Sequence, residues 1–187
     1  MAAASSASII RVPGRLISNP TDLGAGPPYG GTYLGMSRDQ EFIPRPILRP
    51  IRDEAWGSLR DVIYCGESVI FRAVLRYPDT DAVLVNAPKA ISSGSSGVHW
   101  LFRPGGTTGN TRAGTSLGAS SIKLMFAPRA PLAHQAIILY NAVPAIDEAA
   151  RLQLSLGEEY GLACVYYGTP DASGRVYDTG LIANLVL

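Results

Sequence analysis

One five-residue segment of the chain matches a pattern found in serine hydrolases. Gly114-Thr115-Ser116-Leu117-Gly118 has the Gly-x-Ser-x-Gly spacing, which holds a nucleophilic serine on a sharp turn between a strand and a helix. Here the segment lies in a Gly-, Ser- and Thr-rich tract, and no strand is predicted before it. Hydrolases of this kind place an acid between the serine and the histidine, yet no acid lies between Ser116 and His134. We therefore expect a chance match and no catalytic serine.

The other residues that could do chemistry are few and scattered. His99 and His134 are the only histidines, and we expect His99, beside Trp100, to pack rather than to act as a base. Three carboxylate pairs flank strand-like runs, without the burial that would raise a pKa for acid–base catalysis; they are Asp53-Glu54, Asp147-Glu148 and Glu158-Glu159. Cys65 and Cys164 lack the spacing of a zinc site or a disulfide framework. We predict no catalytic, cofactor-binding or metal-binding residue, and no cofactor.

The composition favours one domain that associates with other chains. A length of 187 residues suits a single domain with its own core. Only 17% of the residues are charged, against about 25% in soluble domains, so we expect partner subunits to cover part of the surface. The net charge of +1 gives no overall case for nucleic-acid binding.

The charges are nevertheless unevenly distributed. Residues 82–146 contain no Asp or Glu, although five cations fall inside that span: Lys89, Arg103, Arg112, Lys123 and Arg129. Two interpretations stay open. The cations either pair with acids elsewhere, or form an electropositive patch that faces phosphate or an acidic neighbour.

The N-terminus and the hydropathy give no targeting signal. Residues 1–10 lack the basic and apolar regions of a signal peptide, and no run reaches the roughly 18 apolar residues of a membrane span. The isolated cysteines fit a reducing compartment.

Short alternating runs predict a mainly β protein, specifically an antiparallel β-sandwich or partial barrel with one short helix and long extended loops. Residues 59–77 are predicted as a β-hairpin that turns at residues 65–68. Asp79 or Thr80 would cap a short helix over residues 82–86, and residues 147–151 could add one turn. Further strands are predicted at residues 9–12, 16–17, 122–126, 136–143, 152–156, 160–167 and 181–187.

Two long polar stretches interrupt these strands, at about residues 19–57 and 88–121. Loops longer than roughly 12–15 residues are uncommon in compact domains unless they have a function, and we expect these two to contact other copies of the chain. Pro44, Pro46 and Pro50 should keep residues 42–51 extended. The predicted organisation is one domain over residues 1–187, with an N-terminal arm at about 1–20.

The order of these features resembles the tail tube protein, or major tail protein, of tailed bacteriophages. The first likeness is the loop that ends in Tyr29-Gly-Gly-Thr-Tyr-Leu-Gly35, followed by Phe42-Ile-Pro-Arg-Pro46. The second is the predicted hairpin at residues 61–76, followed by the short helix. The third is the pair of segments at residues 138–144 and 162–177. Together they span most of the chain from about residue 20 onward.

The resemblance implies a β-sandwich whose copies form rings of six around a lumen and stack into a tube through which DNA passes. The partners would be other copies of the chain and other tail proteins (tape measure, terminator and possibly a sheath), with DNA present only transiently and no membrane. The location would be the virion tail, assembled in the host cytoplasm, and no catalytic residues are implied. Because a conduit should not hold DNA tightly, Arg103 and Arg112 are expected to face subunit contacts and not the lumen.

Other functions fit the same patterns. Another phage particle component, such as a tail terminator, a head–tail connector or a capsid decoration protein, could share a small β-rich fold. A monomeric β-sandwich that binds a ligand would use exposed aromatic residues, for which Tyr29, Trp56 and Trp100 are the candidates. Assembly separates the three, because a tube protein forms many rings, a terminator or connector forms one, and a binding module forms none.

Overall fold

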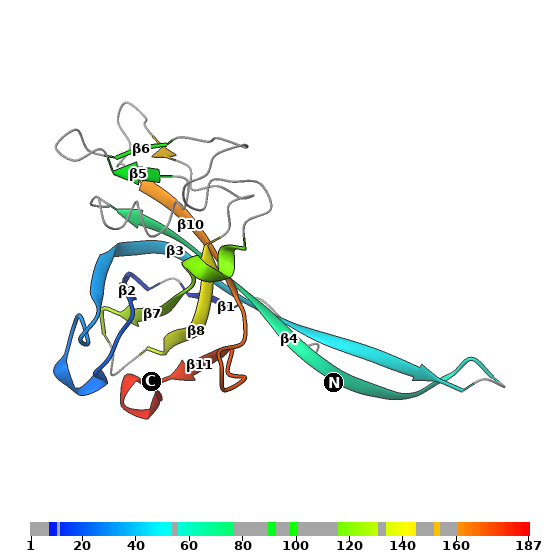
Figure 1. The fold of residues 1–187 in the computed structure, drawn as a ribbon. Helices are drawn as coiled ribbons and strands as arrows, with labels where there is room; N and C mark the ends of the chain where they lie inside the picture. The colour runs from blue at the N-terminus through cyan, green and yellow to red at the C-terminus, as the bar shows by residue number, and fades with distance from the viewer. Residues whose placement is uncertain are drawn as a thin grey trace.

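The computed structural model describes residues 8–10, 12–53, 56–76, 90–92, 98–100, 116–130, 134–144, 152–153 and 161–187. Within these residues the regular structure consists of β-strands and three short 3-10 helices (Figure 1). The strands are β1 (Ser8–Ile10), β2 (Gly14–Ser18), β3 (Thr32–Arg52), β4 (Leu59–Arg76), β5 (Ala90–Ser92), β6 (Val98–Trp100), β7 (Ile122–Pro128), β8 (Ala136–Pro144), β9 (Leu152–Gln153), β10 (Gly161–Gly168) and β11 (Tyr177–Gly180). The 3-10 helices are η1 (Leu23–Ala25), η4 (Leu117–Ser120) and η5 (Ile182–Asn184).

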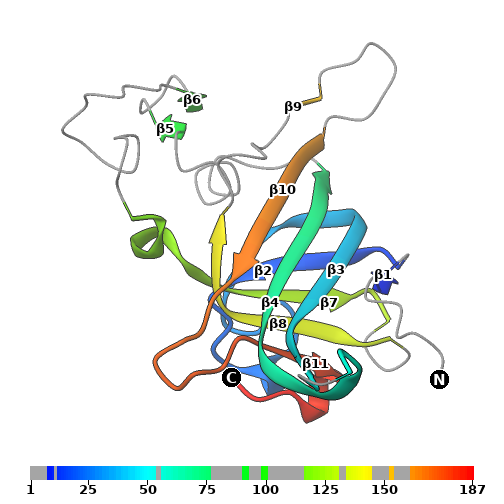
Figure 2. The same ribbon diagram turned by 90° about the vertical axis from the view of Figure 1, so that its right-hand side faces the viewer.

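Six antiparallel strands close into a barrel in the order β8-β7-β2-β3-β4-β10, as Figure 2 shows. The closing contact pairs β10 with β8, with Tyr166, Tyr167 and Gly168 opposite Pro144, Val143 and Ala142. Gly168 lies where β10 also pairs with Val69 of β4, and a Cβ at this glycine would overlap the Val69 side chain. The absence of a side chain at Gly168 therefore lets three strands meet where the barrel closes.

The strands β1, β9 and β11 add to the margins of the barrel, on β3, β10 and β8 respectively. β3 changes partner along its length, because it pairs with β2 as far as Ser37 and with β1 from Gln40 onward. An irregularity in register between Arg38 and Glu41 accompanies this change. Asp39 has a φ of 52° there, and the Gln40 amide donates a hydrogen bond to the Ser37 hydroxyl at 2.7 Å.

The interior of the barrel is filled by alternate residues of its strands. Phe71, Phe126 and Tyr166 are fully buried, and the Phe71 ring lies 6.2 Å from that of Phe126 and 6.5 Å from that of Tyr166, between ring centroids. Leu16, Leu34, Leu75, Leu124, Leu139 and Leu162 complete much of this cluster. Burial of these side chains provides the main driving force for folding.

A second apolar cluster covers the outside of β2, β7 and β8. Ile17, Met125 and Ile138 of these strands are fully buried there. Tyr29 and, from the C-terminal segment, Ile182 and Leu185 pack over them. The Tyr140 hydroxyl donates to the Val186 carbonyl at 2.7 Å, which holds the C-terminus on this face. The chain therefore covers one outer face of its own barrel.

The mainly β prediction, with its partial-barrel form, is confirmed, and so are several individual strands. The predicted strands at residues 122–126, 136–143 and 160–167 correspond to β7, β8 and β10, and the predicted extended segment at residues 42–51 lies in β3. A turn at residues 171–174 follows β10, with the Gly174 N–H donating to the Asp171 carbonyl at 3.0 Å.

Three predictions about local structure are wrong. The stretch at residues 19–57 is not one long loop, because Thr32–Arg52 forms strand β3. Residues 59–77 do not form a hairpin of their own, because Leu59–Arg76 is a single strand, β4, that pairs with β3. Residues 181–187 do not form a strand, because Ile182–Asn184 is a 3-10 turn that places Ile182 and Leu185 against the outer cluster.

Some predictions fall outside the described residues. They are the short helix at 82–86, the turn at 147–151, and the positions of Arg103 and Arg112. Of the stretch at residues 88–121, the structure describes β5, β6 and residues 116–121.

Candidate interaction surface

The described part of the segment that resembled a hydrolase motif, residues 116–118, opens a short helical turn. Ser116 directly precedes η4, and its Oγ accepts a hydrogen bond from the Gly118 N–H at 3.3 Å. A strand, β7, follows this short helix, whereas the catalytic arrangement needs a strand before the serine and a helix after it. Ser116 is therefore the N-cap of a helical turn.

Among the described residues, the other candidate chemical groups do not converge on a site; Glu54, Asp147-Glu148 and Glu158-Glu159 lie outside the description. His134 is exposed, and His99 lies in β6. Cys65 is exposed in β4, whereas Cys164 is buried in β10, where burial raises the pKa of its thiol. Within the described ranges, His, Cys, Asp and Glu residues do not gather as metal ligands, and no helix is long and apolar enough to cross a membrane.

The most distinctive surface is a two-stranded extension of the barrel. Residues 45–52 of β3 and 59–68 of β4, with the turn between them, are called here the projecting hairpin, which extends well beyond the barrel in Figure 1. At about 3.3 Å per residue, its eight β3 residues span about 25 Å. An isolated two-stranded ribbon is only marginally stable in water, so this length without a supporting layer requires explanation.

Exposed apolar side chains are concentrated in the projecting hairpin. Ten large apolar side chains are exposed among the described residues, and seven belong to this element. The seven are Ile47, Leu48, Trp56, Leu59, Val62, Ile63 and Tyr64. Single exposed apolar residues are ordinary, but a contiguous group marks a surface that binds a partner.

One face of the projecting hairpin continues the inner face of the barrel. Phe42 of β3 is opposite Phe71 of β4, and both are buried in the core. Every second β3 residue after Phe42 points to the same side, and residues directly opposite each other share a face. That side therefore presents Leu48 opposite Tyr64 and Pro50 opposite Val62. These four residues are called the apolar face of the projecting hairpin.

The two edges of the projecting hairpin differ. Pro44, Pro46 and Pro50 are paired with Val69, Glu67 and Val62, and a proline is compatible with a ladder only where its nitrogen faces away from the partner strand. The free edge of β3 therefore lacks three backbone donors, which discourages pairing with a further strand. The β4 edge has no proline between Leu59 and Ser68. A further strand could add only along that edge.

The tip of the projecting hairpin is an ordered turn that displays Trp56. The Asp53 N–H donates to the Ser58 carbonyl and the Gly57 N–H donates to the Asp53 carbonyl, both at 2.9 Å. The Asp53 carboxylate accepts from the Trp56 N–H at 3.2 Å, and Gly57 supplies the positive φ of 63° that the turn needs. Trp56 is 86% exposed. These hydrogen bonds hold the backbone on either side of Trp56, while its indole is exposed to water.

The base of the projecting hairpin is tied to the barrel by Glu67. Its carboxylate accepts hydrogen bonds from Tyr177 of β11 at 2.8 Å and from Tyr64 at 3.2 Å. Burial and the Glu67 carboxylate raise the pKa of Tyr177 to about 12. The Tyr177 ring also packs edge-on against Phe42, with ring centroids 5.0 Å apart. These contacts fix the direction in which the hairpin leaves the barrel.

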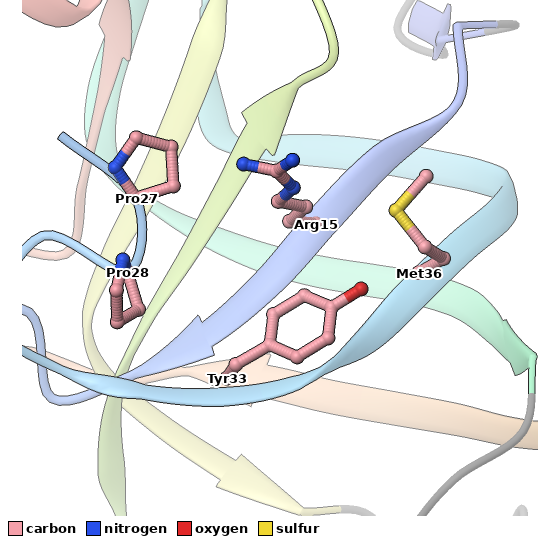
Figure 3. A pocket seen from close by; sticks show the side chains of 5 residues that line it. All are labelled: Arg15, Pro27, Pro28, Tyr33 and Met36. Carbon is pink, nitrogen blue, oxygen red and sulfur yellow. The ribbon is translucent and has the colours of Figure 1, made fainter.

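A groove on the outside of β2 and β3 is the second candidate surface. Figure 3 shows Arg15 of β2, Tyr33 and Met36 of β3, and Pro27 and Pro28 of the preceding loop around a hollow of about 390 Å³. An adjoining hollow of about 630 Å³ shares Tyr33 and Met36. Tyr33 is 41% exposed, so this outer face, unlike that of β7 and β8, keeps an aromatic side chain in contact with water.

Comparison with known proteins does not place the chain in a family. No protein-family model matches it, and no curated protein does. The function is therefore inferred from the geometry described above and from the sequence resemblance.

The projecting hairpin is not among the predicted elements, although the sequence contains a signal for it. Pro44, Pro46 and Pro50 all occupy even positions, which is the period of two expected for one edge of a strand. Of the three aromatic candidates named for a ligand-binding module, Trp56 is exposed and Tyr29 is buried. The side chain of Trp100 is outside the description.

Proposed function

We propose that this chain is a structural protein of a bacteriophage virion that assembles with copies of itself into stacked rings of six, forming the tail tube through which DNA passes. The observation that supports this best is the projecting hairpin, whose apolar face repeats the barrel's buried pattern without a covering layer in its own subunit. The resemblance of the chain to tail tube proteins is the reason for proposing a tail tube among the possible assemblies.

The shape of the subunit favours head-to-tail association. A hairpin that reaches away from the barrel contacts a different part of its neighbour, and such heterologous contacts form rings when the rotation closes and filaments when it does not. Burial of a large apolar side chain contributes about 1.5–3 kcal/mol. Burial of the apolar face and Trp56 would therefore contribute to the free energy of association.

The closed barrel adds a second argument. Closure through β8 and β10 pairs the two ends of the six-stranded barrel, so the open edges that remain belong to elements outside it, namely β1, β9, β11 and the projecting hairpin. The projecting hairpin is the longest such element in the described ranges. In a virion tail the same surface would also be available to other tail proteins, such as the terminator.

Electron microscopy of the purified full-length chain tests this function. We expect tubules with a regular axial repeat when the protein is concentrated. Isolated rings would instead identify a terminator or connector, and particles of one subunit at every concentration would favour a monomeric binding module and overturn the proposal. Sedimentation velocity on the same samples gives the number of chains in the smallest ring.

A further inference from the structure

The groove beside Arg15 lies on an outer face that the chain leaves open. The neighbouring outer face of β2, β7 and β8 is covered by Tyr29 and the C-terminal segment. Beyond that cover, the groove is walled by flat or flexible apolar groups from Pro27, Pro28, Tyr33 and Met36. Hollows of about 300–1,000 Å³ with apolar walls and a few polar groups suit compact ligands, and 390 Å³ accommodates an indole ring.

The described lining of this groove is cationic. Arg15 contributes to one hollow, and Arg38 and Arg76 contribute to the other. No described lining residue is acidic. Asp39 pairs with Arg38 at 3.6 Å but is not among the lining residues. An occupant of the groove should therefore combine an aromatic group with negative charge.

The tip of the projecting hairpin has this combination. Residues 52–59 contain two carboxylates, Asp53 and Glu54, and one cation, Arg52, which donates to the Gly57 carbonyl at 3.2 Å, so their formal net charge is −1. Trp56 is the most exposed large apolar side chain of the described residues, at 86%. The backbone N–H groups of Asp53, Trp56 and Gly57 are already hydrogen-bonded, which lowers the cost of ordering these residues on docking. A guanidinium such as that of Arg15 is also a favourable neighbour for an indole face.

We propose that Trp56 at the tip of one subunit docks into the groove formed by Arg15, Pro27, Pro28, Tyr33 and Met36 of a second copy of the chain. This inference rests on the self-assembly proposed above and names the surface that receives the hairpin. Each subunit then has one tip and one groove, so every contact leaves a free tip at one end and a free groove at the other. The assembly consequently has a direction.

Two single substitutions test the two sides of this contact one at a time. Trp56→Ala removes the tip and keeps the groove, whereas Arg15→Glu keeps the tip and reverses the charge of the groove. Each variant alone should self-associate about ten-fold more weakly or worse than the wild type in sedimentation velocity. Mixed in equal amounts, the two variants should form a two-chain complex, because the tip of the Arg15→Glu chain meets the intact groove of the Trp56→Ala chain.

Controls make the outcomes distinct. Val186→Ala removes an equally isolated exposed apolar side chain and should associate like the wild type. Circular dichroism and an unfolding curve establish that each variant folds, and Met36→Lys replaces Arg15→Glu if the latter does not fold. A groove variant that assembles like the wild type, or a mixture that stays monomeric, overturns the docking site and leaves self-assembly intact. A wild-type chain that is monomeric at every concentration overturns both proposals.

Discussion

The barrel and the projecting hairpin share strands β3 and β4, yet the side chains of these strands are buried in the barrel and exposed in the hairpin. Along β3 and β4, the pair Phe42 and Phe71 is buried in the barrel core. A few residues further along the same face, Leu48 and Tyr64 are 55% and 59% exposed. The β3 side of this face continues across the boundary, with a shift in register against β4 between Ile47 and Leu48, whereas the burial does not continue. Because this face carries apolar side chains, as a core does, but is exposed in its own subunit, we propose that it binds a partner.

The difference also separates stability from assembly. In the barrel, side chains that pack against one another determine whether the chain folds. In the projecting hairpin, the side chains have few intramolecular contacts to lose. Substitutions in the two regions should therefore affect different measurements, and the predictions below use that contrast.

The largest expected effect is that of Phe71→Ala. Phe71 is 1% exposed between Phe126 and Tyr166, so its truncation leaves a cavity and should lower the free energy of unfolding by about 3–5 kcal/mol. Val62→Ala, on the same strand but 44% exposed, should change it by less than about 0.5 kcal/mol. Denaturant unfolding of both variants checks the contrast. Equal losses would mean that the hairpin packs against its own subunit.

The next largest effect concerns the two thiols. Cys65 is exposed in the projecting hairpin and Cys164 is buried in the barrel, where burial raises the pKa of the thiol and so disfavours the reactive thiolate. Reaction of Cys164 requires opening of the barrel, which we expect to slow it at least about a thousand-fold relative to Cys65. A thiol-specific chromogenic reagent measures both phases, and Cys65→Ser should abolish only the fast one. Two fast phases would contradict the closed barrel.

A smaller effect is predicted for the tie at the base of the hairpin. The pKa of Tyr177 is raised from its ordinary value of about 10 to about 12. The folded protein therefore keeps this proton between pH 10 and 12 after the unfolded chain has lost it, so the contribution of Tyr177 to stability is complete below pH 10 and disappears as the pH rises through 12. Tyr177→Phe should cost less than about 1 kcal/mol at neutral pH. It should also reduce the loss of stability between pH 10 and 12.

Unfolding curves at several pH values, on the wild type and on Tyr177→Phe, measure this pH dependence of the free energy of unfolding. The variant keeps the aromatic ring that packs against Phe42, so it isolates the hydrogen bond to Glu67. An identical pH dependence in both proteins would show that this bond does not form in solution.

Much of the barrel could be predicted because its strands correspond to apolar runs in the sequence. Residues 136–143 are almost continuously apolar, which is typical of a strand buried on both faces, and β8 is such a strand. The C-terminus was harder, because residues 181–187 are apolar at every position except Asn184, as in a buried strand, while Ile182 and Leu185, three positions apart, pack as one side of a 3-10 turn. Local pattern alone does not distinguish these cases.

The projecting hairpin could not be predicted in the same way. Its β3 strand is rich in proline, which is typical of turns, and Gly66 suggested a turn where β4 instead continues with a φ of 132°. The actual turn follows Asp53, whose carboxylate accepts from the Trp56 N–H. Pairing with a distant strand fixes both features, and a single run of sequence does not reveal that pairing.

The central claim is that the projecting hairpin serves assembly and not the fold of its own subunit. Replacing residues 46–67 by Asn-Gly closes the ladder on the pair Arg45 and Ser68 with a two-residue turn. Sedimentation velocity and thermal unfolding of this shortened chain test the claim directly. We predict a folded monomer, with an unfolding midpoint close to that of the wild type, that forms neither rings nor tubules under conditions where the wild type assembles. A shortened chain that still assembles, or one that no longer folds, would contradict it.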